Sequence, residues 1–201
     1  MFYIDIITMK KDLVFFGIQW SGKWTQADLL LKDFPNYKYL EPGQIFRALT
    51  SNKNIISDHI TERMSQWKML DDSLAFDLFN MYGHLLSSKS KMLLDWFPRS
   101  LPQMYYFLSK ESKHKRDFIG VHFYLSKEKA IERLLKRAKE QWRKDDTKKS
   151  ITKRLNTFEK ETLPVIEYFE KIDKLITIDA DQDVNLIYKD LLKQLKKHWA
   201  M

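Results

Sequence analysis

A glycine-containing segment near the start of the chain has residue types that can bind phosphate. Gly17, Gly22 and Lys23 have the spacing G-x-x-x-x-G-K. The segment follows a short apolar run at 13–16 and precedes a helical pattern at 27–31. In such a turn, backbone N–H groups and the helix N-terminus point at phosphate oxygens, and the lysine adds a charge. The spacing therefore predicts a phosphate-binding loop.

The residue after Lys23 departs from this pattern. A phosphate-binding loop of this type continues with Ser or Thr, whereas here Trp24 stands before Thr25. Taken without its surroundings, the segment is explained equally well as a glycine turn that joins a strand to a helix. The apolar run before it and the helical pattern after it favour phosphate binding.

Short apolar runs alternate with stretches of helical periodicity along the chain. The runs cover residues 13–16, 37–40, 92–94, 118–125 and 175–178. Short buried runs separated by helices are typical of a parallel sheet with helices on both faces. The predicted fold class is therefore α/β, a class in which ligands bind at the carboxyl ends of the strands.

Three helical stretches can be delimited in the second half of the chain. Ser126 is a suitable N-cap for a helix that runs to about Glu140. Apolar residues within 151–169 recur with a helical period, and Pro164 is expected to kink or break that stretch. Residues 184–195 are predicted to form a last amphipathic helix.

The composition limits the classes of protein to which the chain can belong. Its 201 residues include no cysteine, which excludes disulfide scaffolds and cysteine-ligated zinc or iron–sulfur sites. No apolar run reaches the ~18 residues of a membrane span, and the first residues do not resemble a signal peptide. We therefore expect a cytoplasmic protein of one domain. Its net charge of +8 predicts an anionic partner, such as a nucleotide or a nucleic acid.

Further motifs follow the loop in a defined order. They are PGQIFR at 42–47, the string D-x-F-P-R-x-x-P-Q at 95–103, Arg133 with Arg137, WRKDD at 142–146, RL at 154–155 and TLPVI at 162–166. With these motifs the chain resembles the nucleoside monophosphate kinase family, and adenylate kinase in particular, over residues 12–195. The string at 95–103 is the most specific of them.

The resemblance implies a P-loop fold of three layers, with a five-stranded parallel sheet and helices on both faces. Residues 1–201 would then form a single kinase domain with two small insertions. The implied core covers about 10–40, 71–136 and 147–201, the monophosphate-binding insert about 41–70 and the short lid about 137–146. A lid so short and without cysteine is similar to that of the short-lid members, so no zinc is expected.

The resemblance also implies which residues bind ATP. Lys23 would hold its phosphates together with the loop amides, Arg133 would stack on its base, and Arg137 would contact its phosphates. The implied set is Gly17, Trp20, Ser21, Gly22, Lys23, Trp24, Thr25, Arg133 and Arg137. Without the resemblance, two arginines one helical turn apart among other charged residues favour a solvated helix face.

A second implied set binds the monophosphate and the phosphoryl group in transfer. Arg47 and Arg99 would hold the phosphate of the monophosphate, and Gln103 would hydrogen-bond its base. The implied monophosphate-binding residues are Gly43, Arg47, Leu70, Trp96, Arg99 and Gln103. The implied catalytic residues are Lys23, Arg99, Arg143 and Arg154, whose charges would surround the migrating phosphoryl group.

Mg²⁺ is the cofactor that the resemblance implies, with ATP as co-substrate. Asp95, at the end of an apolar run, would orient water molecules on the ion. Asp145 and Asp146 are implied to do the same from the lid. A pair of acids that starts a helix and is favoured by its dipole is the alternative explanation for these two residues.

Tryptophan stands at several positions where the family has glycine. They are Trp20, Trp24, Trp67, Trp96 and Trp142, five of the six tryptophans. We hypothesise that UGA codons, which some bacterial lineages read as Gly and others as Trp, were translated with the wrong table. The alternative is a genuine relative that has lost activity. Because glycine allows positive φ and close approach to phosphate, the chain with indoles in the loop is expected to bind ATP poorly.

The implied reaction is ATP + AMP ⇌ 2 ADP, catalysed by a monomer that binds ATP and a nucleoside monophosphate, with no membrane or nucleic-acid partner. Pro42, Gly43 and Gln44 stand where the family commonly has T-G-D, so a UMP/CMP-type kinase is an alternative. A basic nucleic-acid-binding protein is an alternative of another class, although no recognition motif accompanies the scattered lysines.

Overall fold

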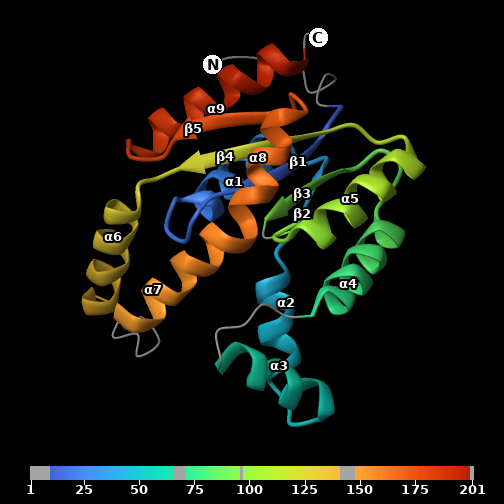
Figure 1. The fold of residues 1–201 in the computed structure, drawn as a ribbon. Coiled ribbons are helices and arrows are strands. Elements are labelled where there is room, and N and C mark those ends of the chain that lie inside the picture. Colours follow the sequence, from blue (N-terminus) through green and yellow to red (C-terminus); the bar gives the residue numbers. More distant parts are fainter. Residues whose placement is uncertain (1–9, 66–70, 96, 141–147, 200–201) are drawn as a thin grey trace.

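A parallel β-sheet forms the centre of the protein. The computed structural model describes residues 10–65, 71–95, 97–140 and 148–199. Within these residues, five parallel strands form one sheet in the order β2-β3-β1-β4-β5 (Figure 1). The strands are β1 (Asp12–Phe16), β2 (Tyr37–Leu40), β3 (Lys91–Asp95), β4 (Phe118–Tyr124) and β5 (Leu175–Asp179). The predicted α/β class and the predicted five-stranded sheet are confirmed, and the apolar runs match the strands to within one residue at each end.

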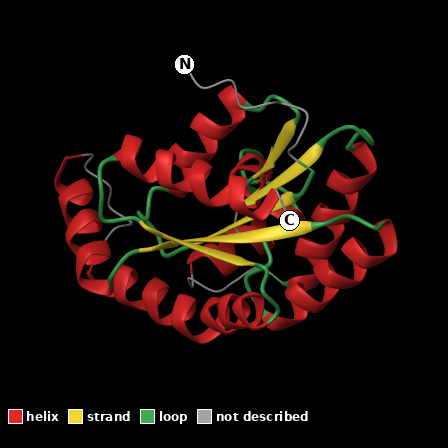
Figure 2. Cartoon of the chain, turned by 90° about the horizontal axis from the view of Figure 1, so that it is seen from above, coloured by secondary structure: helices red, strands yellow, loops and turns green. Residues whose placement is uncertain are grey.

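Helices cover both faces of the sheet, which therefore lies as the middle of three layers (Figure 2). The helices are α1 (Lys23–Asp33), α2 (Pro42–Leu49), α3 (Ile55–Ser65), α4 (Asp72–Leu85), α5 (Leu101–His114), α6 (Lys127–Glu140), α7 (Lys148–Thr157), α8 (Leu163–Lys171) and α9 (Val184–Trp199). Ser126 accepts a hydrogen bond from the backbone N–H of Lys129, 3.2 Å away, as its predicted N-cap role requires. No helix of the described residues is both long and apolar enough to cross a membrane.

The stretch around Pro164 is not broken, but its helical geometry changes just before the proline. A π-helical segment, Phe158–Thr162, lies between α7 and α8. Pro164 falls in the first turn of α8, where the absence of a backbone N–H is tolerated. Helix α7, the π-helical segment and α8 follow one another in a continuous run of helical residues beside the sheet (Figure 1).

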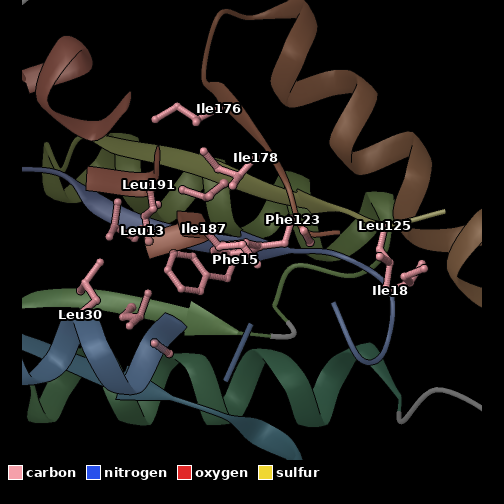
Figure 3. Close-up of a cluster of buried hydrophobic side chains, with 14 of the residues drawn as sticks. Leu13, Phe15, Ile18, Leu30, Phe123, Leu125, Ile176, Ile178, Ile187 and Leu191 are labelled. Carbon is pink, nitrogen blue, oxygen red and sulfur yellow. The ribbon is translucent and has the colours of Figure 1, made fainter. Parts of the chain in front are cut away.

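The apolar side chains of the strands form two clusters, one on each face of the sheet, because successive residues of a strand point to opposite faces. One cluster joins β1, β4 and β5 to α1 and α9 and includes Leu13, Phe15, Leu30, Phe123, Ile178 and Leu191 (Figure 3). The other joins the opposite face to α4, α5 and α8 and includes Val14, Phe16, Phe79, Phe107 and Phe169. Full burial of such a side chain contributes about 1.5–3 kcal/mol, so these clusters hold the layers together.

Gly120 on β4 allows α8 to approach the sheet closely. A Cβ at this position would lie 2.8 Å from Cδ1 of Phe169 and 3.0 Å from Cε2 of Phe16. Those contacts are shorter than packed side chains adopt, and the two rings already meet edge to face with centroids 5.0 Å apart. A hydrogen atom as side chain is therefore what this packing requires.

A buried ionic cluster lies at the amino end of the sheet. Arg116 donates from Nε and Nη2 to the two carboxylate oxygens of the fully buried Asp12, at 2.5 and 2.6 Å. The backbone N–H of Met92 donates to the same carboxylate at 2.7 Å. Glu111 is buried beside them, and its Oε2 has no hydrogen-bond partner in the described part of the chain. Burial, and next the charge of Asp12, raises the pKa of Glu111 to about 8.

Candidate active site

The loop between β1 and α1 requires glycine at two positions. Gly17 has φ +148°, and a Cβ there would lie 2.6 Å from Ser21 Oγ and 2.7 Å from the carbonyl oxygen of Phe123. Gly22 has φ +82° and immediately precedes α1. Both φ values lie in the region that favours glycine. Helix α1 consequently begins at Lys23 with its free N–H groups at the loop, which is the arrangement that binds anions.

Trp20 adopts a backbone conformation that favours glycine. Its φ is +69°, a left-handed conformation that costs a non-glycine residue about 1–2 kcal/mol. The strain expected for an indole in this loop is therefore present in its backbone. Neither side chain is buried within the loop, because Trp20 is 37% and Trp24 is 59% exposed. The other three tryptophans at family glycine positions, Trp67, Trp96 and Trp142, lie outside the described residues.

The ammonium group of Lys23 lies inside the loop. Nζ donates to the carbonyl oxygens of Gly17 at 2.8 Å and Ile18 at 3.2 Å, and the residue is almost fully buried. Burial lowers the pKa of Lys23, and the nearby charge of Asp95 opposes that shift. The lysine is thus held by oxygen atoms that an anionic group can replace.

Asp95 ends β3 beside the loop, at the carboxyl edge where the sequence places it. Its Oδ2 accepts a hydrogen bond from the Tyr39 hydroxyl at 3.2 Å. Its Oδ1 is buried and has no hydrogen-bond partner in the described residues. Burial raises the pKa of Asp95, while Lys23, Tyr39 and Arg99 act in the opposite direction. Burial likewise lowers the pKa of Arg99 to about 10, opposed by Asp95. Lys23 and Asp95 are therefore buried near each other, and the half-buried Arg99 lies near enough to affect both charges.

The start of α5 forms a polar cluster next to Arg99. The amide of Gln103 accepts from the backbone N–H of Arg99 at 2.8 Å and donates to Asp72 Oδ1 at 2.8 Å. Ser100 caps α5 and also donates to Asp72, at 3.2 Å. Gln103, which the sequence assigns to base recognition, is thus buried with both ends of its amide engaged by the protein. Asp72 was missed by sequence reasoning, since an acid in the first turn of α4 is explained by the helix dipole alone.

Arg47 and Gly43 lie on α2, which the structure places beyond the carboxyl end of β2 (Figure 1). Nη2 of Arg47 lies 3.4 Å from Oε1 of Glu41 in an exposed ion pair. A Cβ on Gly43 would lie 3.4 Å from Nη1 of Arg47. Gly43 and Arg47 therefore lie close together on α2, with Glu41 beside them.

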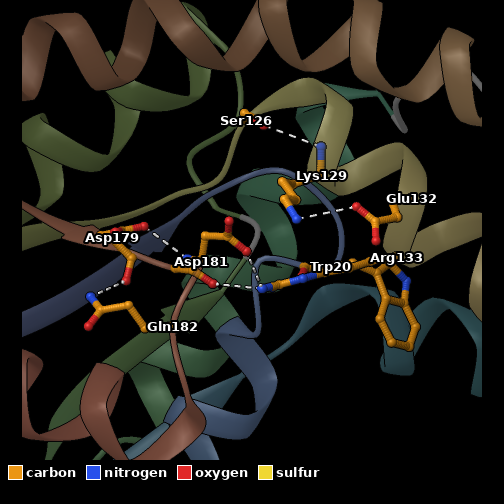
Figure 4. A network of polar contacts seen from close by, with 9 residues as sticks. Trp20, Ser126, Lys129, Glu132, Arg133, Asp179, Asp181 and Gln182 are labelled. Carbon is orange, nitrogen blue, oxygen red and sulfur yellow. Dashed lines mark hydrogen bonds and ion pairs between the residues drawn. The ribbon is translucent and has the colours of Figure 1, made fainter.

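Two arginines from distant helices reach the phosphate loop. Arg154 on α7 donates from Nη1 to Oε1 of Gln19 at 3.2 Å. Arg133 on α6 donates from Nη1 to the carbonyl oxygen of Trp20 at 3.2 Å (Figure 4). The explanation of Arg133 as part of a solvated face is wrong, because its guanidinium group is hydrogen-bonded to the backbone of the loop. Gln19, on the other hand, carries no signal by which the sequence could have identified it.

Several predicted site positions cannot be placed. Leu70, Trp96, Arg143, Asp145 and Asp146 lie outside the described residues. Arg137 belongs to α6, but its side chain is also outside the described part. The residues that the structure does bring together around the loop are Gly17, Trp20, Ser21, Gly22, Lys23, Asp95, Arg99, Arg133 and Arg154. Ser21 is fully buried, and Thr25 lies in the first turn of α1.

A glycine-dependent loop at a helix N-terminus, a buried lysine and nearby arginines provide the N–H groups and positive charges that phosphate oxygens accept from. The family model described as "Adenylate kinase" matches residues 15–174. The chain belongs to the adenylate kinase family. The resemblance found in the motifs is thereby confirmed, and with it the assignment of the chain as a nucleoside monophosphate kinase, a phosphotransferase.

Curated members of this family are similar to the chain over most of its length. An "Adenylate kinase" from Prochlorococcus marinus (strain AS9601) is 31% identical over 189 residues, covering 93% of this chain and 100% of that protein. A "Uridylate kinase" from Saccharomyces cerevisiae is 31% identical over 178 residues, covering 85% and 83%. A "Uridylate kinase" from Schizosaccharomyces pombe is 29% identical over 185 residues, covering 89% and 93%. The relatives thus include both kinds of kinase that the sequence leaves open.

Proposed function

We propose that the protein is an adenylate kinase, which transfers the γ-phosphoryl group of ATP to AMP and forms two ADP. The observation that carries the proposal is the buried ammonium group of Lys23 inside the glycine loop, with the buried carboxylate of Asp95 at the adjacent end of β3. Arg99 is half-buried and lies near enough to affect both groups. Such charges at the carboxyl edge of a parallel sheet suit a transferred phosphoryl group and its metal ion. Phosphoryl transfer needs such positioning and charge more than it needs a chemical base.

ATP binds at the loop in this proposal. The N–H groups at the start of α1 and the ammonium of Lys23 hold its phosphates, and Lys23 exchanges the carbonyl oxygens of Gly17 and Ile18 for phosphate oxygens. Arg133 lies against its base, and Arg137 reaches its phosphates. Ser21, Gly22, Trp24 and Thr25 line the same loop and first turn.

AMP binds on the side of α2 and α5. Arg47 releases Glu41 to bind the phosphate of the monophosphate, together with Arg99. Gln103 contacts the base once its amide exchanges one of its present partners. Gly43, Leu70 and Trp96 complete this side. The insert at about 41–70 and the lid at about 137–146 close over both nucleotides and exclude water, which prevents hydrolysis of ATP.

Arg99, Arg143 and Arg154 stabilise the phosphoryl group in transfer, with Lys23. A guanidinium presents a planar fork that matches two phosphate oxygens at once. Arg154 already lies at the loop through its contact with Gln19. Closure of the lid is expected to bring Arg143 to the same point.

Mg²⁺ fits the residues present at the end of β3. The buried Oδ1 of Asp95 has no hydrogen-bond partner among the described residues, and it is a hard oxygen acceptor of the kind that holds a water molecule of a hydrated magnesium ion. Among the described residues, no group of three or more histidine, cysteine or acidic side chains is placed to hold a metal ion. The ion would supply charge neutralisation between the β- and γ-phosphates. The protein is proposed to act as a monomer in the cytoplasm.

A UMP/CMP-type kinase is the second candidate, because two of the relatives are named uridylate kinases and Pro42 and Gln44 replace two residues of the usual adenine-side motif. The test measures phosphoryl transfer from ATP to AMP, UMP, CMP and GMP. It uses the protein with Trp at positions 20, 24, 67, 96 and 142 and a variant with Gly at these five positions. The highest kcat/KM with AMP supports the proposal, and the highest with UMP or CMP supports the alternative. No transfer by either protein would identify an inactive relative.

A further inference from the structure

One guanidinium group joins three segments that are distant in the sequence. Nη1 of Arg133 donates to the carbonyl oxygen of Trp20. Nη2 donates to the carbonyl oxygen of Ala180 at 3.1 Å and to Oδ1 of Asp181, also at 3.1 Å. Figure 4 shows Asp181 and Trp20 meeting the guanidinium from the β5–α9 turn and from the phosphate loop. Helix α6, the phosphate loop and the β5–α9 turn are therefore connected at a single side chain.

These acceptors engage the edge of the guanidinium. N–H groups lie in the plane of the group, so hydrogen bonds to them fix the orientation of that plane. The side chain of Arg133 remains 31% exposed, and its planar face is the part that in-plane acceptors do not use. A planar cation with a fixed orientation can stack on a nucleotide base.

The turn that carries Asp181 is itself braced. The backbone N–H of Asp181 donates to Oδ1 of Asp179 at 2.9 Å, and that of Ala180 donates to the carbonyl oxygen of Tyr124 at 2.8 Å. Gln26 on α1 donates to the carbonyl oxygen of Val184 at 3.1 Å, where α9 begins. The carboxylate is thus presented from a turn that is tied to β4 and to the helix of the phosphate loop.

We propose that Asp181 is a positioning residue for the donor nucleotide: its carboxylate fixes the plane of Arg133 so that the guanidinium face meets the base of ATP. This inference rests on the proposed function, since it requires a nucleotide at the loop. Asp181 acts through Arg133 and touches no phosphate. Its contribution therefore belongs to binding of the base and is absent for a ligand that has phosphates only.

The test compares Asp181→Ala and Asp181→Asn with two parent proteins. One parent has Trp at positions 20, 24, 67, 96 and 142, and the other has Gly at these positions. Glu132→Gln is the matched control, because Glu132 neighbours Arg133 in the chain but pairs with Lys129 at 3.4 Å instead (Figure 4). Calorimetry measures the Kd of ATP and of inorganic tripolyphosphate, which has no base. Steady-state kinetics measures KM for ATP and for the monophosphate, together with kcat.

Asp181→Ala is expected to raise the Kd and KM of ATP about five-fold, the size of effect that a half-exposed ion pair supports. The Kd of tripolyphosphate, the KM of the monophosphate and the thermal midpoint stay at parent values. Asp181→Asn, which keeps the acceptor oxygen, recovers part of the loss, and Glu132→Gln changes nothing. With Arg133→Ala already present, Asp181→Ala has no further effect, because the two residues act as one unit.

Equal increases in the Kd of ATP and in the Kd of tripolyphosphate would overturn the inference. An unchanged KM for ATP in Asp181→Ala, made in a parent that is active, would overturn it as well. An effect that persists without Arg133 would also overturn it. If neither parent transfers phosphoryl groups to any monophosphate, the proposed function is wrong, but this result does not contradict the role of Asp181. If neither parent binds ATP in calorimetry, which does not depend on turnover, the role of Asp181 is wrong as well.

Discussion

Arg154 donates a hydrogen bond to Gln19 across 3.2 Å, although the two residues are 135 positions apart in the chain. The contact brings the guanidinium of Arg154 from α7 to the loop between β1 and α1. The pair therefore holds a cation at the place where the proposed function requires one.

Arg154→Ala is expected to lower kcat about 10²–10³-fold, the usual effect of removing one transition-state contact. Arg154→Lys recovers only part of the loss, because an ammonium group cannot bind two oxygens in one plane. Gln19→Ala is the matched control and leaves kcat within about two-fold, since Gln19 only holds the arginine in the resting state. Steady-state kinetics checks all three. Equal kcat losses for Gln19→Ala and Arg154→Ala would contradict this account.

Replacing each loop tryptophan by glycine separates backbone strain from burial. Trp20→Gly relieves a positive φ, whereas Trp24→Gly places glycine in the first turn of α1 and loses helix propensity. Trp20→Gly is therefore expected to be the less destabilising by about 1 kcal/mol. Burial alone predicts the opposite order, because Trp20 is the less exposed of the two. Urea unfolding of both variants decides between strain and burial.

Peptides from the source organism test the codon hypothesis directly. We expect mass spectrometry to find glycine at positions 20 and 24, and the corresponding codons to be UGA. The left-handed φ of Trp20 is the structural reason for expecting glycine at that position. Tryptophan in those peptides would end the hypothesis and favour a relative that lost activity.

The buried Glu111 makes the stability of the fold depend on pH. Its folded-state pKa, about 8, lies above the ordinary value of 4.5 because of burial and of Asp12, while Arg116 and Lys91 oppose the shift. The stability that its proton provides is complete below pH 4.5 and is lost as the pH rises to about 8. Tyr82, whose buried hydroxyl has a raised pKa beside Asp12, stays neutral over this range.

Glu111→Gln keeps the shape of the side chain and removes this titration. As the pH rises, the free energy of unfolding of the variant is expected to exceed that of the parent by a growing amount, which increases by up to about 1.4 kcal/mol per pH unit. Denaturant unfolding from pH 5 to pH 8, roughly the range between the two pKa values, measures it. Glu170→Gln on the exposed face of α8 is the control. Parallel stability curves for Glu111→Gln and the parent would show that Glu111 carries no excess proton.

Asp95→Asn tests the role assigned to the carboxylate at the end of β3. The variant keeps the hydrogen bond from Tyr39 but loses the charge that faces Lys23. We expect kcat to fall about 10²-fold and the Mg²⁺ concentration for half-maximal rate to rise. Circular dichroism checks that the sheet is intact. A variant with the metal dependence of the parent would exclude Asp95 from the metal site.

The strands and the loop were predictable because their signals are local. β1 is buried along its whole length, so its apolar run marks it directly, and Gly17 and Gly22 stand where positive φ is needed. The contacts that complete the site are not local. Gln103 meets Asp72 over 31 positions and Arg133 meets Asp181 over 48. No spacing rule encodes such pairs, because tertiary packing alone brings them together.

Arg133 shows how a local rule fails. Its neighbours on α6 are charged, so helical periodicity favours a solvated face. The β5–α9 turn and the phosphate loop instead supply it with acceptors. The family motif alone identified Arg133 as a site residue, and the structure alone identified the carboxylate of Asp181 beside it.

The hydrogen side chain of Gly120 also matters far from its own strand. Helix α8 rests there through Phe169, and the hydroxyl of Thr162, just before α8, donates to the carbonyl oxygen of Arg99 at 3.1 Å. Arg154 lies further back along the same helical rod. A methyl group added at residue 120 would have to displace Phe169 and so would shift the helical run that also carries Arg154. The position of Arg154 therefore depends on how closely α8 packs against β4.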